Sequence, residues 1–127
     1  MPPLFSTPHY YVELHESEIP WVKIFSAHPY KELTDCDPQT KAALFTCMDT
    51  CERVLRAYYA PEKINIALFG NYLPHLHIHV MARFKEDAYF PESMWGVKQR
   101  ESTLILPPLE GFINALTRAL ESLTCKG

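Results

Sequence analysis

The chain has 127 residues, of which 47% are hydrophobic, and this is enough for the core of one compact domain spanning residues 1–127. Its formal net charge of −3 provides no basic field, which argues against a nucleic-acid polymer as the main partner but allows a small phosphorylated ligand. No run approaches the roughly 20 apolar residues of a membrane span, and the first residues lack the pattern of a signal peptide. We therefore expect a cytoplasmic protein with no membrane contact.

Two runs rich in β-branched and aromatic residues, 10–14 and 21–25, predict the first strands. A polar stretch ending in Pro20 separates them, so we expect an antiparallel pair. His28 follows the second run, and by itself it has the pattern of an ordinary surface residue.

The clearest helix begins at Asp37, an N-cap carboxylate that is followed by proline at the first helical position. Apolar residues then recur at intervals of three and four as far as Pro61, which ends the helix. The sequence contains no Cys-x-x-Cys pair, so a disulfide set or a metal knot is disfavoured. We expect free thiols at all four cysteines, Cys36, Cys47, Cys51 and Cys125.

The second half of the chain predicts further strands and a closing helix. Residues 63–69 are an apolar run broken by Asn65, and Gly70-Asn71 form a turn after it. Residues 102–106 are a candidate short strand, and an amphipathic helix starts at Leu109. We therefore expect an α+β fold, in which an antiparallel sheet of about five strands carries one long helix and a C-terminal helix.

The most informative stretch is residues 75–81, in which three histidines alternate with apolar residues. Successive side chains of a strand point to opposite faces, so His75, His77 and His79 share one face. The apolar residues that alternate with them, at 76, 78 and 80, share the other face and are expected to face the core. In a helix the same spacing would scatter the rings, so the pattern predicts a strand with one titratable face.

Three explanations of these histidines remain open at this point. A structural role would bury three polar rings without a use, which is costly. A zinc site would take two ligands from His-x-His but needs others to converge on it. A catalytic role would use imidazole as a nucleophile and proton carrier, because imidazole titrates near neutrality.

The pattern of residues 75–81 closely resembles the motif of histidine triad (HIT) proteins, which are nucleotide hydrolases and transferases. Weaker resemblance extends from about Trp21 to Trp95. Within this range the chain is similar to small one-domain bacterial HIT proteins, and the similarity lies in Gly70-Asn71, Pro74, Ala82-Arg83-Phe84 and Phe90-Pro91.

The resemblance implies a role for each of four histidines. His77, the middle one of the triad, corresponds to the family nucleophile, and the backbone carbonyl of His75 is expected to fix its tautomer. His79 is expected beside the phosphate, where it bonds the phosphate oxygens or protonates the leaving group. His28 is carried over as a supporting member of the cluster.

Four other residues are candidates for nucleotide or phosphate binding. Asn65 is either a strand residue facing water or, by resemblance, a polar contact near the phosphate or ribose. Asn71 stands where relatives often have a glutamine that touches the phosphates. Arg83 either pairs with phosphate or is a solvated cation at the strand end. Trp95 lines the pocket, lies in a dimer interface or serves packing alone.

The function implied by the resemblance is cleavage at the α-phosphorus of a nucleotidyl ester, a dinucleoside-polyphosphate-like anhydride or a phosphoramidate. The reaction would pass through a nucleotidyl-histidine and need no metal or other cofactor. The expected partners are an adenine nucleotide and a second copy of the chain in a homodimer. The alternatives are a non-catalytic nucleotide-binding or sensing module and a His-ligated metal hydrolase.

Overall fold

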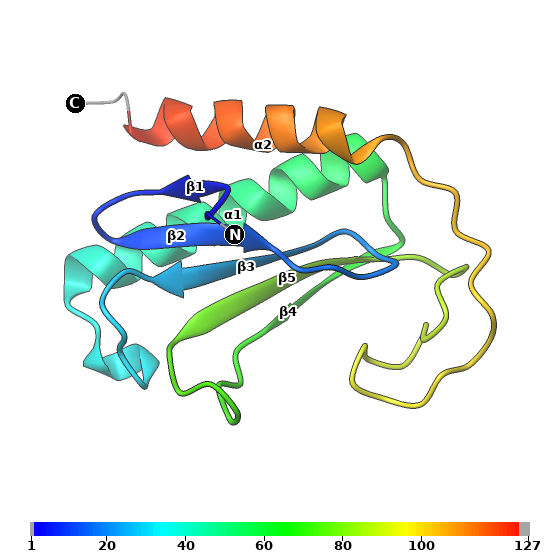
Figure 1. Ribbon diagram of the computed structural model, residues 1–127, viewed down its shortest axis with the longest axis horizontal. Coiled ribbons are helices and arrows are strands. Elements are labelled where there is room, and N and C mark those ends of the chain that lie inside the picture. Colours follow the sequence, from blue (N-terminus) through cyan, green and yellow to red (C-terminus); the bar gives the residue numbers. More distant parts are fainter. Residues whose placement is uncertain (1, 125–127) are drawn as a thin grey trace.

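The computed structural model describes residues 2–124 and shows a five-stranded antiparallel sheet with two helices (Figure 1). The strands lie in the order β1-β2-β3-β5-β4, and each pairs with its neighbours in antiparallel register. This confirms the predicted α+β class. Their bounds are β1 Phe5–Ser6, β2 Tyr10–Leu14, β3 Trp21–Ser26, β4 Lys63–Ala67 and β5 His77–Arg83.

The long helix α1 (Pro38–Tyr59) begins and ends where the sequence predicts. The Asp37 carboxylate accepts a hydrogen bond from the backbone N–H of Thr40 at 3.1 Å, so it caps the first turn. Ala60 adopts a left-handed conformation with φ 47°, and Pro61 follows. A short 3₁₀ turn (Leu33–Asp35) precedes α1, and α2 (Leu109–Thr124) closes the described chain.

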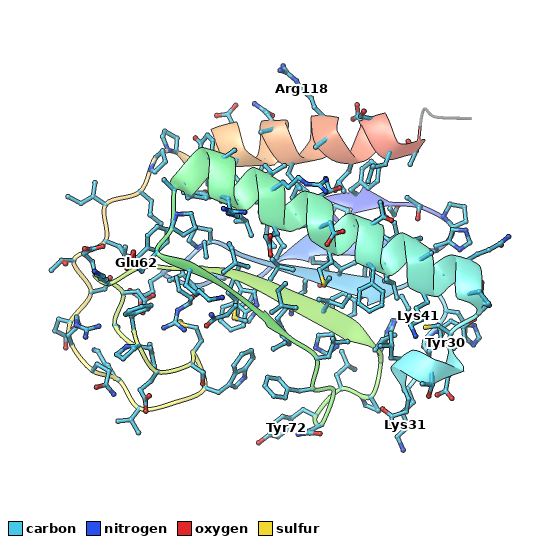
Figure 2. The ribbon with its side chains drawn as sticks, turned by 180° about the vertical axis from the view of Figure 1, so that it is seen from behind. Tyr30, Lys31, Lys41, Glu62, Tyr72 and Arg118 are labelled. Carbon is cyan, nitrogen blue, oxygen red and sulfur yellow. The ribbon has the colours of Figure 1, made fainter. Side chains whose placement is uncertain are left out.

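The helices lie on one side of the sheet. Seen from behind, α1 crosses in front of the strands, and α2 runs alongside α1 at the outer edge (Figure 2). The core between these layers combines strand residues such as Val22 and Ile78 with helix residues such as Leu44 and Leu55, all fully buried. From α2 it takes Phe112, Leu116 and Leu120.

The register of β3 with β5 decides which side chains share each face. Val22 pairs with Val80 and Ile24 with Ile78, and these pairs lie in the core beneath α1. The alternate pairs point to the opposite, helix-free face, because side chains alternate along a strand. They are Trp21 with Met81, Lys23 with His79 and Phe25 with His77.

Three strand predictions need correction. Residues 102–106 form no strand, because they run outside the sheet, with Ile105 95% exposed and Thr103 N–H bonded to the Glu86 carbonyl. The fifth strand is instead β1, which pairs with β2. β4 ends at Ala67, and β5 starts at His77, so His75 lies just before the strand.

The thiols of Cys47 and Cys51 are buried in the core, Cys36 is half-buried, and these three are free. Cys125 lies outside the described residues. Within residues 2–124, neither helix combines the length and the apolar character that crossing a membrane requires.

Candidate active site

A cavity of about 450 Å³ opens on the helix-free face of the sheet. Side chains from β3 and β5 form its floor, and the loop after β4 and the segment after β5 contribute to its walls. The lining residues are His15, Trp21, Lys23, Phe25, Phe69, Gly70, Asn71, Tyr72, Leu73, His77, His79 and Trp95.

The ring of His77 is held by a hydrogen bond to the backbone. Its Nδ1 lies 2.7 Å from the carbonyl oxygen of His75. Because a carbonyl oxygen only accepts, Nδ1 carries the proton, and Nε2 of the neutral ring keeps its lone pair. The Phe25 ring stacks on His77 with centroids 4.9 Å apart. His77 is therefore oriented with one nucleophilic nitrogen.

The ring of His79 is also held by a hydrogen bond at Nδ1, but there the partner is a donor and not an acceptor. The indole Nε1–H of Trp21 donates to Nδ1 of His79 at 3.0 Å. Burial, followed by the neighbouring His77, Lys23 and His15, lowers the pKa of His79 to about 4. His79 is therefore neutral at pH 7.

Aromatic rings surround the two histidines. Trp95 contacts His79 edge-on with ring centroids 5.1 Å apart, and it meets Trp21 at 5.3 Å and Phe69 at 4.8 Å. Trp95 is half exposed, and it is one of the lining residues that the sequence predicted. A wall of this kind suits a planar aromatic group, which stacks on it.

Lys23 is the one Lys or Arg among the described residues that line the cavity. Its Nζ lies 5.6 Å from the centroid of the Phe25 ring, which itself stacks on His77. A cation at this place favours an anionic group of a ligand beside the histidines. Asn71, predicted as a phosphate contact, is exposed and also lines the cavity.

The other two predicted histidines lie outside the lining of this cavity. The Nε2–H of His75 donates to the carbonyl of Ser26 at 2.6 Å, and its ring packs edge-on against Phe25. His28 is exposed, and its ring lies 4.7 Å from that of Tyr30. His75 therefore contributes its backbone carbonyl to the site, and the structure does not bring the His28 ring into it.

The expectation for Arg83 needs correction, because its side chain is buried and engaged elsewhere, and Asn65 lies outside the lining of the cavity. Arg83 is 1% exposed, so it is neither solvated nor open to a ligand. Its guanidinium forms a two-point ion pair with Asp87 and donates to Asn65 Oδ1 at 2.8 Å and to the Glu92 carbonyl at 2.7 Å. Arg83 therefore stabilises the structure around the site, and Asn65 Oδ1 is one of the acceptors of its guanidinium.

Sequence reasoning missed Trp21, Lys23 and Phe25 as site residues. Their alternation along one strand was visible, but the face they share with the triad depends on how β3 pairs with β5. His15 and Phe69 were missed as well, and they come from connections beside the sheet. Within residues 2–124, no group of three or more His, Cys, Asp and Glu side chains is arranged to hold a metal ion.

The sheet, its single covered face and its paired histidines define an α+β protein with a histidine-based site on the open face. The family model described as the HIT domain matches residues 16–86, which is more than half of the chain. The chain therefore belongs to the HIT, or histidine triad, family, as the resemblance implied.

Solved structures agree with this assignment. A histidine triad protein from Bradyrhizobium japonicum is 29% identical, with a TM-score of 0.77, and the match covers 93% of this chain and 89% of that one. One from Sinorhizobium meliloti 1021 is 26% identical, with a TM-score of 0.72 and coverage of 94% and 87%. One from Marinobacter aquaeolei VT8, 23% identical, shares the fold, with a TM-score of 0.75 and coverage of 95% and 89%. No curated protein matched the sequence.

Proposed function

We propose that this protein is a nucleotide hydrolase or transferase that attacks the α-phosphorus of a nucleotidyl ester, anhydride or phosphoramidate through His77. The observation that carries the proposal is the 2.7 Å hydrogen bond from His77 Nδ1 to the His75 carbonyl. It leaves the lone pair of Nε2 free to act as a nucleophile. Membership in the HIT family supports the same assignment.

The proposed reaction has two displacements. In the first, His77 Nε2 bonds to phosphorus, and the bond from phosphorus to the leaving group breaks, with its electron pair departing on that group. The His75 carbonyl stabilises the positive charge that develops on the ring, because it accepts from Nδ1–H. In the second, water attacks phosphorus and loses a proton to solvent, and the electron pair of the Nε2–P bond returns to His77. A different acceptor in place of water gives transfer.

The proposed ligand is a small nucleotide, with adenine as the expected base. The exposed rings of Phe69 and Trp95, which line the cavity, offer stacking surfaces for a base, and such stacking contributes about 1–3 kcal/mol per base. Lys23 and Asn71 line the same cavity and offer polar contacts to the phosphates. We also propose that two copies of the chain form a homodimer.

Turnover of a panel of adenylylated esters, anhydrides and phosphoramidates tests this function, with wild type and His77→Ala measured side by side. We expect His77→Ala to lose turnover by about 10³-fold or more, because the covalent route is removed. It should still bind nucleotide, since the remaining walls are intact. Mass spectrometry of the wild type after rapid denaturation at neutral pH should show one added nucleotidyl group.

Two outcomes would replace the proposal with one of the alternatives. Nucleotide binding without turnover or adduct would identify a non-catalytic binding module. Stoichiometric, tightly bound zinc, with activity restored only by metal, would identify a metal hydrolase.

A further inference from the structure

The hydrogen bond between Trp21 and His79 determines which nitrogen of His79 can hold a proton. The indole nitrogen can only donate a hydrogen bond and cannot accept one. The 3.0 Å contact therefore requires a lone pair on Nδ1 of His79. The proton of the neutral ring must then sit on Nε2. Charging the ring would place a second N–H on Nδ1, opposite the indole N–H, and would break the bond.

The groups that face His79 also disfavour its charged form. His77 lies on the same strand with ring centroids 4.8 Å apart, and Lys23 is the register partner of His79 on β3. His15, on the connection from β2 to β3, packs on Trp21 with centroids 4.1 Å apart. Among the described residues, the other rings that contact His79 are the uncharged rings of Trp21, Phe69 and Trp95. Each titratable neighbour is thus neutral or cationic, in agreement with the depressed pKa of His79.

We propose that Trp21 is a positioning residue that holds His79 as a neutral hydrogen-bond donor, so that His79 binds a phosphate oxygen and does not protonate the leaving group. This inference rests on the proposed function and refines it. In the first displacement the leaving group departs with the electron pair of its bond to phosphorus and takes its proton from solvent. The Nε2–H of His79 stays on the ring and donates to a non-bridging oxygen as negative charge grows there. Leaving groups that are stable as anions, those of anhydrides and acidic esters, are then favoured over the amines of phosphoramidates.

The tautomer can be measured in the free protein, without a substrate. Long-range ¹H–¹⁵N spectra of the imidazoles should show His79 protonated at Nε2 and unprotonated at Nδ1 from pH 7 down to about 5. Trp21→Phe keeps an aromatic ring but removes the donor, so this variant should show a mixture of tautomers and a higher titration midpoint. Trp95→Phe is the matched control, because Trp95 contacts the same ring edge-on with no hydrogen bond, and it should keep the Nε2 tautomer. His79→Gln identifies the signals of His79.

A wild-type His79 that carries its proton on Nδ1, or that titrates near neutrality, would overturn the inference. So would a Trp21→Phe variant that keeps both the tautomer and the midpoint. Because these spectra need no turnover, their result is independent of whether the proposed function holds.

Kinetics provide a second test that does not depend on the folding of Trp21→Phe. The amide of Gln places an N–H donor near the position of Nε2 but cannot supply a proton, whereas Ala offers neither. We expect His79→Gln to keep kcat within about tenfold of wild type and His79→Ala to fall by about 10–100-fold, as the loss of a hydrogen bond to a charged group predicts. Across a series of aryl esters of AMP, the kcat of wild type and the kcat of His79→Gln should depend equally steeply on the acidity of the leaving phenol. If the kcat of His79→Gln falls further below that of wild type as the phenol becomes less acidic, His79 is a proton donor. If no ester is cleaved by any form, the proposed function fails, and the spectra alone decide the tautomer.

Discussion

At the scale of single residues, two histidines two positions apart on β5 have opposite hydrogen-bonding roles. The strand period places His77 and His79 on one face, but their neighbours differ. Nδ1 of His77 donates to a carbonyl oxygen, and Nδ1 of His79 accepts from an indole. As a result, Nε2 carries a lone pair on one ring and a proton on the other. One residue type repeated along a strand thus provides both a ring nitrogen with a free lone pair and a hydrogen-bond donor.

The low pKa of His79 makes the stability of the fold depend on pH below neutrality. Unfolding returns the ring to water, where the pKa of imidazole is about 6.5, so between pH 6.5 and about 4 the unfolded chain binds more protons at this residue. The free energy of unfolding should therefore fall as the pH drops through this range, by about 1–3 kcal/mol from His79. Urea denaturation of wild type and of the non-titrating His79→Gln, at several pH values from 7 to 4, measures this contribution. An identical loss in both proteins would contradict it.

The sequence was enough to predict that His77 and His79 share a face, because that depends only on the period of a strand. It could not identify Trp21 as the partner of His79, since 58 positions separate them and the register of β3 with β5 brings them together. For Arg83 the sequence shows only a charge near the end of a strand. Its burial follows from the path of the chain after residue 83, which folds the carboxylate of Asp87 back onto it.

At the scale of elements, the ion pair of Arg83 and Asp87 holds the segment after β5 against the sheet. Asp87 accepts from the backbone N–H groups of Phe84, Tyr89 and Phe90, in addition to the guanidinium. Burial alone would raise the pKa of Asp87, but these hydrogen bonds together hold it below its ordinary value. Arg83 also donates to the Glu92 carbonyl. The same segment carries Trp95, so this buried network supports one wall of the cavity.

We expect Asp87→Asn to destabilise the protein by about 3–5 kcal/mol, because it leaves the buried guanidinium of Arg83 without its counter-charge. Glu86→Gln, at the exposed neighbouring position, is the control and should change the free energy of unfolding by less than about 0.5 kcal/mol. Urea denaturation at pH 7 compares the two variants with wild type. A change below about 1 kcal/mol in Asp87→Asn would refute this role of the pair. In the folded variant we also expect the KM of the proposed reaction to rise, since Trp95 loses its support.

The elements differed in how well the sequence predicted them. The bounds of α1 were readable because a capping carboxylate, an N-terminal proline and a final proline are local signals. The segment 102–106 has strand-forming residues, but a strand needs a partner, and the edge of the sheet next to β2 is taken by β1. The two residues of β1 are too few to show a period, so pairing with β2 could not be foreseen.

At the scale of the whole molecule, exposed apolar side chains gather at one edge of the sheet. β4 is the last strand in the order, and large apolar residues at its end and in the following loop are exposed. Tyr72 is fully exposed and projects from the lower edge of the molecule in Figure 2. Exposed strand edges and apolar patches are places where a second chain pairs or packs. This set comprises Ile66, Leu68, Phe69, Tyr72 and Leu73, and we take it as the surface of the proposed homodimer.

Sedimentation equilibrium at micromolar protein should therefore give twice the mass of one chain for the wild type. A C₂ interface repeats each residue on both sides of the axis, so one substitution acts twice. Ile66→Lys, on β4 and 41% exposed, should shift the equilibrium to the monomer, because each copy would bury a charge against an apolar surface. Ile105→Lys makes the same chemical change at a position that is 95% exposed and lies outside this set, so it should remain dimeric. A wild type that stays monomeric at every concentration, or an Ile66→Lys variant as dimeric as Ile105→Lys, would place the proposed interface elsewhere or remove it.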